Sequence, residues 1–185
     1  MPVLIRMVAV MSSYISYEQL MVNPGLGELA DIATPKGQPQ MDEQLLAATL
    51  KGTDRSAWTA EEIAEADTAR QRIFDAMTEA QALVNSYLYK AELLPLSEVP
   101  ATITTWTRAI TRYYLHQDRF QGDENDPVVV GYKEAKSMLA QVADGTFSLG
   151  IETTTTPEPS PLAAGPAFTP GLTVMRDAMG DYRNG

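Results

Sequence analysis

The chain has 185 residues, of which 44% are hydrophobic, enough to bury one ordinary core. Its formal net charge of −10 disfavours tight binding to DNA or to an anionic membrane, because phosphate binding needs clustered lysine and arginine. The sequence contains no cysteine, which excludes disulfides, thiolate metal sites and cysteine nucleophiles and fits synthesis in a reducing cytoplasm.

The first thirteen residues, MPVLIRMVAVMSS, are apolar with partial alternation, which predicts an extended N-terminal segment over 1–13. Arg6 interrupts the apolar run and no small-residue cleavage site follows, so we do not expect a signal peptide. No stretch approaches the ~20 apolar residues that a membrane helix requires. We therefore expect a protein that does not associate with membranes.

Three short helices are expected next. Ser16 can cap a helix that continues to about Val22 and ends at Asn23-Pro24-Gly25, and residues 26–32 can form another turn or two. Residues 34–40, TPKGQPQ, predict a loop. Asp42 then begins a helix that contains Leu45, Leu46 and Leu50 and stops at Gly52.

The longest predicted helix runs from Ala60 to about Tyr89. Thr59 and Glu62 have the spacing of a capping box, in which each side chain accepts a hydrogen bond from the other residue's amide. Acidic residues crowd its first turns and Lys90 lies at its end, as the helix dipole favours. Helical spacing predicts that the buried face comprises Ile63, Ala66, Arg70, Ile73, Met77, Ala80, Val84 and Tyr87.

Two further helices follow between residues 93 and 150. Ser97 is expected to cap the first, with Pro100 in its first turn, and Asp126-Pro127 and Gly145 mark the start and stop of the second. The loop over 121–125 is short, so the two helices should be antiparallel neighbours. The apolar face of the first comprises Ile103, Trp106, Ile110, Tyr113 and Tyr114.

These elements predict an all-α fold, an antiparallel helical bundle built on one long helix. We expect an N-terminal extension over 1–13, a helical adaptor domain over 14–150, and a flexible linker with a C-terminal docking arm over 151–185.

The predicted arm begins as a stretch rich in threonine, proline, alanine and glycine, with little to bury. An apolar cluster follows it, a composition typical of a segment that becomes ordered on a partner. An unstructured tail is the alternative. The partner-binding candidates are Phe168, Leu172, Val174, Met175, Arg176, Met179 and Tyr182.

The sequence suggests no catalytic, cofactor or metal site. His116 is the single histidine, and its place at a helix end beside Asp118 and Arg119 favours a structural or interface role. The acidic run Asp123–Asp126 lacks the alternation of a calcium loop and predicts a solvated loop. Gly25-Leu26-Gly27 is not followed by the Lys-Ser/Thr pair of a phosphate loop, and no paired acid–base set suggests an enzyme.

Several short motifs occur in a characteristic order and spacing. They are Tyr14-Ile15-Ser16-Tyr17-Glu18-Gln19-Leu20, Leu94-Pro95-Leu96 with Val99-Pro100, the run RYYLHQD from Arg112 to Asp118, and Gly145-Thr146-Phe147-Ser148-Leu149-Gly150. Over roughly residues 11–150 the chain resembles the Mu-like bacteriophage head–tail joining family.

This resemblance implies a virion neck protein made in the host bacterial cytoplasm. It further implies a homo-oligomeric ring, with twelve copies as the expected number, that lies below the portal protein and accepts a tail terminator or stopper protein. DNA would pass through without sequence-specific binding, and an acidic wall suits such a conduit.

A nucleic-acid-handling packaging protein, similar to a small terminase subunit, is the alternative function. Such a protein needs a recognition helix with clustered positive charge. Arg108, Arg112 and Arg119 supply some positive charge, but aromatic residues separate them and acidic residues follow.

Overall fold

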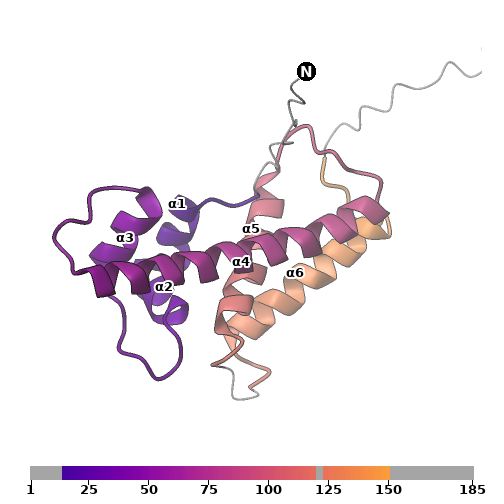
Figure 1. Cartoon of the computed structure of the whole chain (residues 1–185). Helices are drawn as coiled ribbons and strands as arrows, with labels where there is room; N and C mark the ends of the chain where they lie inside the picture. Colours follow the sequence, from indigo (N-terminus) through magenta and orange to yellow (C-terminus); the bar gives the residue numbers. More distant parts are fainter. Residues whose placement is uncertain (1–13, 120–122, 151–185) are drawn as a thin grey trace, which may run out of the picture. The chain divides into compact units, whose positions relative to one another are not determined.

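The computed structural model describes residues 14–119 and 123–150, and every regular element in these ranges is helical (Figure 1). This confirms the predicted all-α fold. The predictions for residues 1–13 and 151–185, including all seven partner-binding candidates, lie outside the described residues. The elements are α1 (Tyr17–Leu20), the π-helical turn η1 (Met21–Gly25), α2 (Leu26–Ala33), α3 (Glu43–Lys51), α4 (Ala60–Lys90), α5 (Ala101–His116) and α6 (Pro127–Ala143).

Helices α1, α3 and α4 begin where polar side chains accept hydrogen bonds from otherwise unpaired amides, as predicted. The Thr59 hydroxyl accepts from the Glu62 amide at 3.3 Å, and the Glu62 carboxylate accepts from the Thr59 amide at 2.8 Å. Ser16 and Gln19 form the same reciprocal pair at α1. The carboxylate of Asp42 caps α3 by accepting from the Leu45 amide at 2.7 Å.

Helix α6 has the predicted start and stop. The Asp126 carboxylate accepts from the Val128 amide at 2.7 Å, and Pro127 occupies the first turn, where its missing N–H leaves no bond unmade. Gly145 follows the last turn with a φ of 74°, a left-handed conformation that disfavours residues with a β-carbon. The amide of Thr146 then donates to the carbonyl of Gln141 at 2.9 Å, which completes the C-terminal cap.

The predicted start of α5 is wrong. Ser97 lies outside the helix, and Pro100 is the N-cap, with extended ψ of 148° and no side-chain cap. The reason is Pro100 itself, because the ring of a proline disfavours helical backbone at the preceding residue, here Val99. A helix that began after Ser97 would have to include Val99 in that disfavoured conformation.

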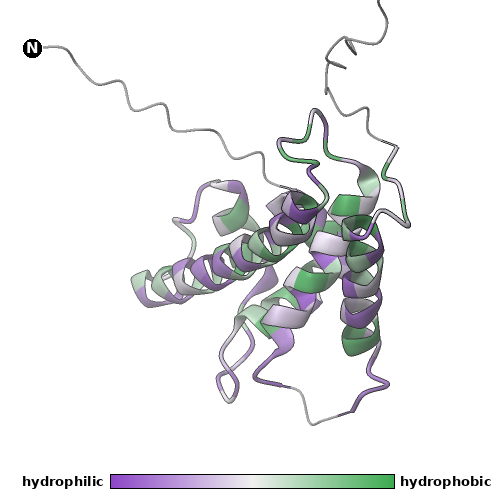
Figure 2. Cartoon of the chain, turned by 90° about the vertical axis from the view of Figure 1, so that its right-hand side faces the viewer, coloured by the Kyte–Doolittle hydropathy of each residue, from purple (hydrophilic) through white to green (hydrophobic). Residues whose placement is uncertain are grey.

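Helix α4 is the shared spine of the fold. At 1.5 Å per residue its 31 residues span about 46 Å. The N-terminal half packs against α1, α2 and α3, and the C-terminal half against α5 and α6 (Figure 1). Figure 2 shows hydrophobic and hydrophilic residues on the same helices, the amphipathic pattern that such packing requires.

Two clusters of buried residues result. Cluster 1 joins α4 to the N-terminal helices and to the last turn of α5, and comprises Ile15, Leu20, Leu29, Ala30, Ile32, Ala33, Leu46, Leu50, Ala69, Ile73, Ala76, Met77 and Leu115. Cluster 2 joins α4 to α5 and α6, with Tyr14 from the segment before α1, and comprises Tyr14, Ala80, Val84, Leu88, Ile103, Ile110, Ala135, Leu139 and Val142.

The predicted buried face of α4 is right along most of its length and wrong at Arg70, and its two end positions, Ile63 and Tyr87, are partly buried. Arg70 is exposed, whereas Ala69 is buried in cluster 1. Leu88 is fully buried, and Tyr87 is partly buried and packs against cluster 2. The helical spacing of apolar residues defines the buried face only to within one residue. Alanines on that face let neighbouring helices approach closely, but they indicate its position less clearly than large apolar residues would.

Helices α5 and α6 are antiparallel neighbours, as predicted. Near the end of α5, the ring of Tyr113 stacks on Tyr132 of α6 with centroids 3.9 Å apart. Near its start, Trp106 meets Phe147, which follows α6, edge to face at 6.0 Å. Of the predicted apolar face, Ile103 and Ile110 are fully buried, and the aromatic residues are partly buried.

Two threonines on the same face of α5 were not predicted to be buried. The hydroxyl groups of Thr107 and Thr111 donate to the carbonyl oxygens of Ile103 and Thr107, each at 2.8 Å. Because each hydroxyl group has a hydrogen-bond partner within the helix, both threonines can be 0% exposed without leaving an unpaired polar group.

Candidate functional site

A charged cluster joins α2 to α5 across 84 to 88 residues of sequence. Arg112 donates to both carboxylate oxygens of Glu28, from Nε at 2.5 Å and from the terminal nitrogen at 2.8 Å. The Nε2 atom of His116 lies 3.1 Å from the same carboxylate. This bidentate geometry is the strong form of an arginine–carboxylate pair.

The pKa of Glu28 reports the balance of forces in this cluster. Partial burial raises the pKa, since it disfavours the charged carboxylate, but the hydrogen bonds and charges of Arg112 and His116 outweigh burial. The net pKa is therefore below the ordinary value of 4.5. Glu28 is held as a carboxylate that fastens α2 to α5.

Two further arginine pairs extend this connection. Arg119 donates to the Asp31 carboxylate at 3.0 Å and to the carbonyl oxygen of Thr34 at 2.9 Å, so it neutralises the C-terminal end of α2. Arg72 of α4 donates to Asp118 at 2.9 Å. Burial raises the pKa of Asp118, but the Arg72 bond and charge dominate and hold the pKa below 3.8.

His116 lies at the end of α5, as predicted, and there it contacts Glu28 of α2. A carboxylate beside an imidazole can also orient a catalytic histidine, but here Arg112 shares the same carboxylate. Such a shared carboxylate is typical of an ion-pair connection between helices. Glu28 was missed as the partner because nothing in the local pattern connects positions 88 residues apart.

The acidic run before α6 is used locally. Asp123 accepts from the Asn125 amide at 2.9 Å, Glu124 pairs with Lys133 at 3.3 Å, and Asp126 caps α6. Within residues 14–119 and 123–150, no group of three histidine, aspartate or glutamate residues is placed to hold a metal ion. No helix in these ranges has the length and apolar character needed to cross a membrane.

An apolar groove lies beside α1 and the middle of α4. Its cavity has a volume of about 690 Å³, and Tyr14, Ile15 and Met77 contribute buried side chains to it. Val99, just before α5, is partly buried beside it. The ring of Phe74 remains 51% exposed, so it offers a large apolar surface to a partner.

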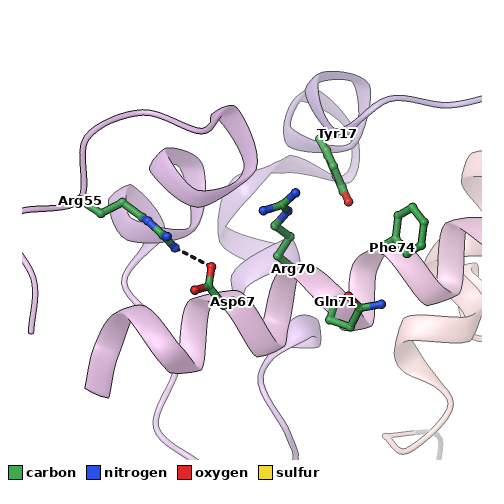
Figure 3. Close-up of a pocket in the computed structure, with 6 residues that line it drawn as sticks. All are labelled: Tyr17, Arg55, Asp67, Arg70, Gln71 and Phe74. Atoms are coloured by element: carbon green, nitrogen blue, oxygen red, sulfur yellow. Dashed lines mark hydrogen bonds and ion pairs between the residues drawn. The ribbon is translucent and has the colours of Figure 1, made fainter. Parts of the chain in front are cut away.

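A second, more polar pocket of about 500 Å³ continues this groove along α4. Both cavities are lined by Tyr17, Arg70 and Phe74. Figure 3 shows Arg70 and Phe74 rising from α4 on the side of Tyr17, with Gln71 at the rim. Arg55 is neutralised by Asp67 at 2.5 Å, whereas Arg70 forms no ion pair among the residues described. Arg70 is therefore the available positive charge of this surface.

We define the groove as Tyr14, Tyr17, Arg70, Phe74, Met77 and Val99. The sequence interpretation missed it, although one signal was present. Phe74 follows the buried Ile73 and therefore lies off the buried face of α4, and a large apolar residue outside that face indicates an interaction surface.

The fold and these surfaces define a helical protein whose helices are joined by ion pairs and which carries an apolar groove beside α1 and α4. The chain belongs to the bacteriophage Mu Gp36 family, whose model matches residues 14–165. A curated relative is the Mu-like prophage FluMu protein gp36 of Haemophilus influenzae, 31% identical over 104 residues, which cover 56% of this chain and 68% of the relative. The chain is thus a Mu-like phage protein.

Proposed function

We propose that this chain is a structural head–tail connector that forms a ring below the portal. The ring would form part of the DNA conduit and provide the platform on which the tail terminator or stopper protein attaches. The observation that carries the proposal is membership of the Mu Gp36 family, since the match over residues 14–165 includes the motifs that resemble head–tail joining proteins.

The electrostatics of the body support a conduit. The net charge of −10 repels DNA, so DNA can pass without being held. Arg72, Arg112 and Arg119 are bound to carboxylates of the same chain, so their charge is not available to phosphates. Because these arginines are used in contacts within the chain, we propose a structural role for this surface and no enzymatic one.

The partners proposed are further copies of the chain, twelve in the ring, together with the portal above and the tail terminator or stopper below. The site of action is the virion neck, after synthesis in the bacterial cytoplasm. We propose no membrane as a partner.

The decisive experiment locates the protein in the particle. A phage that carries an affinity tag on this chain is purified, and its neck is reconstructed by electron microscopy with symmetry averaging. The expected result is a ring of helical density below the portal into which α4, α5 and α6 fit. Density for this chain in the capsid shell or tail tube, or its absence from purified particles, would overturn the proposal.

The packaging alternative is tested separately by electrophoretic mobility shift at low salt, where non-specific electrostatic binding is strongest. We expect no shift of phage DNA by the purified protein. The control is Glu28→Gln, which releases Arg112 from its carboxylate partner. A shift by the unaltered protein that weakens with added salt would favour the small-terminase alternative.

A further inference from the structure

We propose that the groove receives the C-terminal segment 168–182 of a neighbouring copy of this chain. This inference rests on the ring assembly proposed above and identifies the contact that joins adjacent copies.

The groove has the chemistry of a site for an apolar peptide. Its floor is formed by Tyr14 and Met77, which are buried, while Phe74 remains about half exposed. An exposed phenylalanine beside a cavity of about 690 Å³ leaves apolar surface in contact with water until a partner covers it. The occupant should therefore be apolar and narrow enough to lie along a helix.

The C-terminal segment matches this requirement in composition. Its sequence from 168 to 182, FTPGLTVMRDAMGDY, places one large apolar residue every few positions, and its two carboxylates, Asp177 and Asp181, outweigh its one arginine, Arg176, so the segment is negatively charged overall. Arg70 is the positive charge on the groove that no described carboxylate neutralises. An apolar peptide with a nearby carboxylate is complementary to an apolar groove that ends in an arginine.

The N-terminal segment is the less suitable occupant. Residues 1–13 are also apolar, and they connect directly to Tyr14 in the groove. However, they contain no carboxylate, and their one charged side chain is Arg6, which would face Arg70 with the same sign. Charge complementarity therefore selects the C-terminal segment.

The linker is long enough to reach another copy. Seventeen residues, 151–167, separate the described helical body from the segment. At about 3.1 Å per residue, an extended proline-rich linker of this size spans about 53 Å, compared with about 46 Å for the length of α4. A segment on such a linker can therefore reach farther than the length of α4.

A ring also explains why the acceptor is a neighbour. Identical copies related by rotation about a central axis meet through two different surfaces, one on each side of every copy. The groove and the C-terminal segment form such a pair, because each copy has one of each. When every segment occupies the next groove, the ring closes and no groove remains empty.

Cysteine cross-linking tests this arrangement, since the chain has no cysteine of its own. One full-length variant carries Gln71→Cys at the groove rim, and a second, tagged variant carries Met175→Cys. The two are mixed, assembled on the portal, oxidised and analysed by non-reducing electrophoresis. We expect a disulfide-linked dimer that contains one tagged and one untagged chain.

Two controls make the result specific. Ser86→Cys replaces Gln71→Cys at another exposed position of α4, fifteen residues or about 22 Å further along the helix, and should give no such dimer. Adding Arg70→Glu and Phe74→Ser to the groove variant should reduce dimer formation about tenfold or more, because an aromatic anchor and its charge partner are both lost. Both residues are exposed, so circular dichroism should confirm an unchanged fold.

The remaining outcomes are distinguishable. A double variant with both cysteines that gives only internally cross-linked monomer would show that the segment binds its own groove, and would overturn the proposal. Cross-linking of the groove to Leu4→Cys instead of Met175→Cys would identify the N-terminal segment as the occupant and also overturn it. Rings on the portal without a groove–segment cross-link would refute this contact and leave the connector function standing. Absence of the protein from the neck would overturn both.

Discussion

The two ends of α4 are held in different ways. The N-terminal helices are fastened to the rest of the body by charged contacts, in which Glu28 binds Arg112 and Asp31 binds Arg119. The C-terminal helices are joined by aromatic contacts, such as the stacking of Tyr113 on Tyr132. Each end also has its own buried cluster.

This difference separates the conditions that weaken each end. Charged contacts depend on ionisation and are screened by salt, whereas apolar and aromatic contacts depend on burial and change little with ionic strength. One continuous helix therefore carries two apolar cores, and the ion pairs beside cluster 1 add contacts that respond to salt and pH.

The largest effect is expected from removing a fully buried side chain in either cluster. Ile73→Ala in cluster 1 and Ile110→Ala in cluster 2 should each lower the free energy of unfolding by about 2–5 kcal/mol, because each leaves a cavity. Urea denaturation followed by circular dichroism measures the loss. Hydrogen exchange then shows whether α3 and α6 open together in both variants, and selective opening of one end would mean that the clusters unfold independently.

A smaller loss is expected from Glu28→Gln, which removes the charge that Arg112 binds. Because the two side chains are 28% and 32% exposed, solvent reduces the cost to about 1–2 kcal/mol. Urea denaturation at low and high salt measures this loss. Glu124→Gln is the control, since the Glu124 side chain is 84% exposed in its pair with Lys133 and should change stability by less than about 0.5 kcal/mol.

The charged end should weaken in acid. The folded-state pKa values of Glu28 and Asp118 lie below 4.5 and 3.8, so the unfolded chain binds more protons as the pH falls. The stabilisation is present above these ordinary values and is lost as the pH falls through the folded pKa values. Denaturation curves from pH 7 to pH 3 should show the difference between the unaltered protein and Glu28→Gln shrinking, and a constant difference would contradict this assignment.

The aromatic end should weaken in alkali. Burial, with smaller contributions from Tyr132 and Glu79, raises the pKa of Tyr114 to about 12 from 10.0. The fold therefore favours the neutral phenol, and its contribution is complete below pH 10 and lost as the pH rises toward 12. Tyr114→Phe should reduce this loss in denaturation curves at pH 8, 10 and 11. Tyr89→Phe, at a side chain 76% exposed, should behave like the unaltered protein.

The smallest effect is expected at the exposed pair between Lys90 and Asp144. Although the atoms lie 2.6 Å apart, the side chains are 64% and 60% exposed, and such pairs contribute about 0–1 kcal/mol. Lys90→Ala should therefore leave the urea midpoint nearly unchanged. A loss of stability as large as that of Glu28→Gln would show that the short distance between the two charges matters more than their exposure to solvent.

Helix boundaries were the most predictable part of the fold, because caps act within one turn. Thr59 with Glu62, Asp42 and Gly145 each satisfy local amides or carbonyls, and their sequence spacing is sufficient to place them. Ser97 failed because a proline three residues later restricted the backbone, a second local rule that competed with the first.

The candidate site was much less predictable, because it depends on contacts between distant positions. Tyr14 and Phe74 meet at the groove only after α1 packs on α4, and Glu28 meets Arg112 only after α2 packs against α5. Local spacing cannot show such meetings. The choice between Ala69 and Arg70 for the buried face of α4 likewise depended on how closely the neighbouring helices approach.

The continuity of α4 also has a mechanical consequence. A bending load on either cluster is transmitted to the other through the hydrogen-bonded backbone of one helix, because no loop interrupts it between Ala60 and Lys90. Phe74 lies near the middle of this helix and faces outward. A partner held at Phe74 would therefore apply force near the centre of the helix, where the load is shared between both ends and neither core can be pulled away alone.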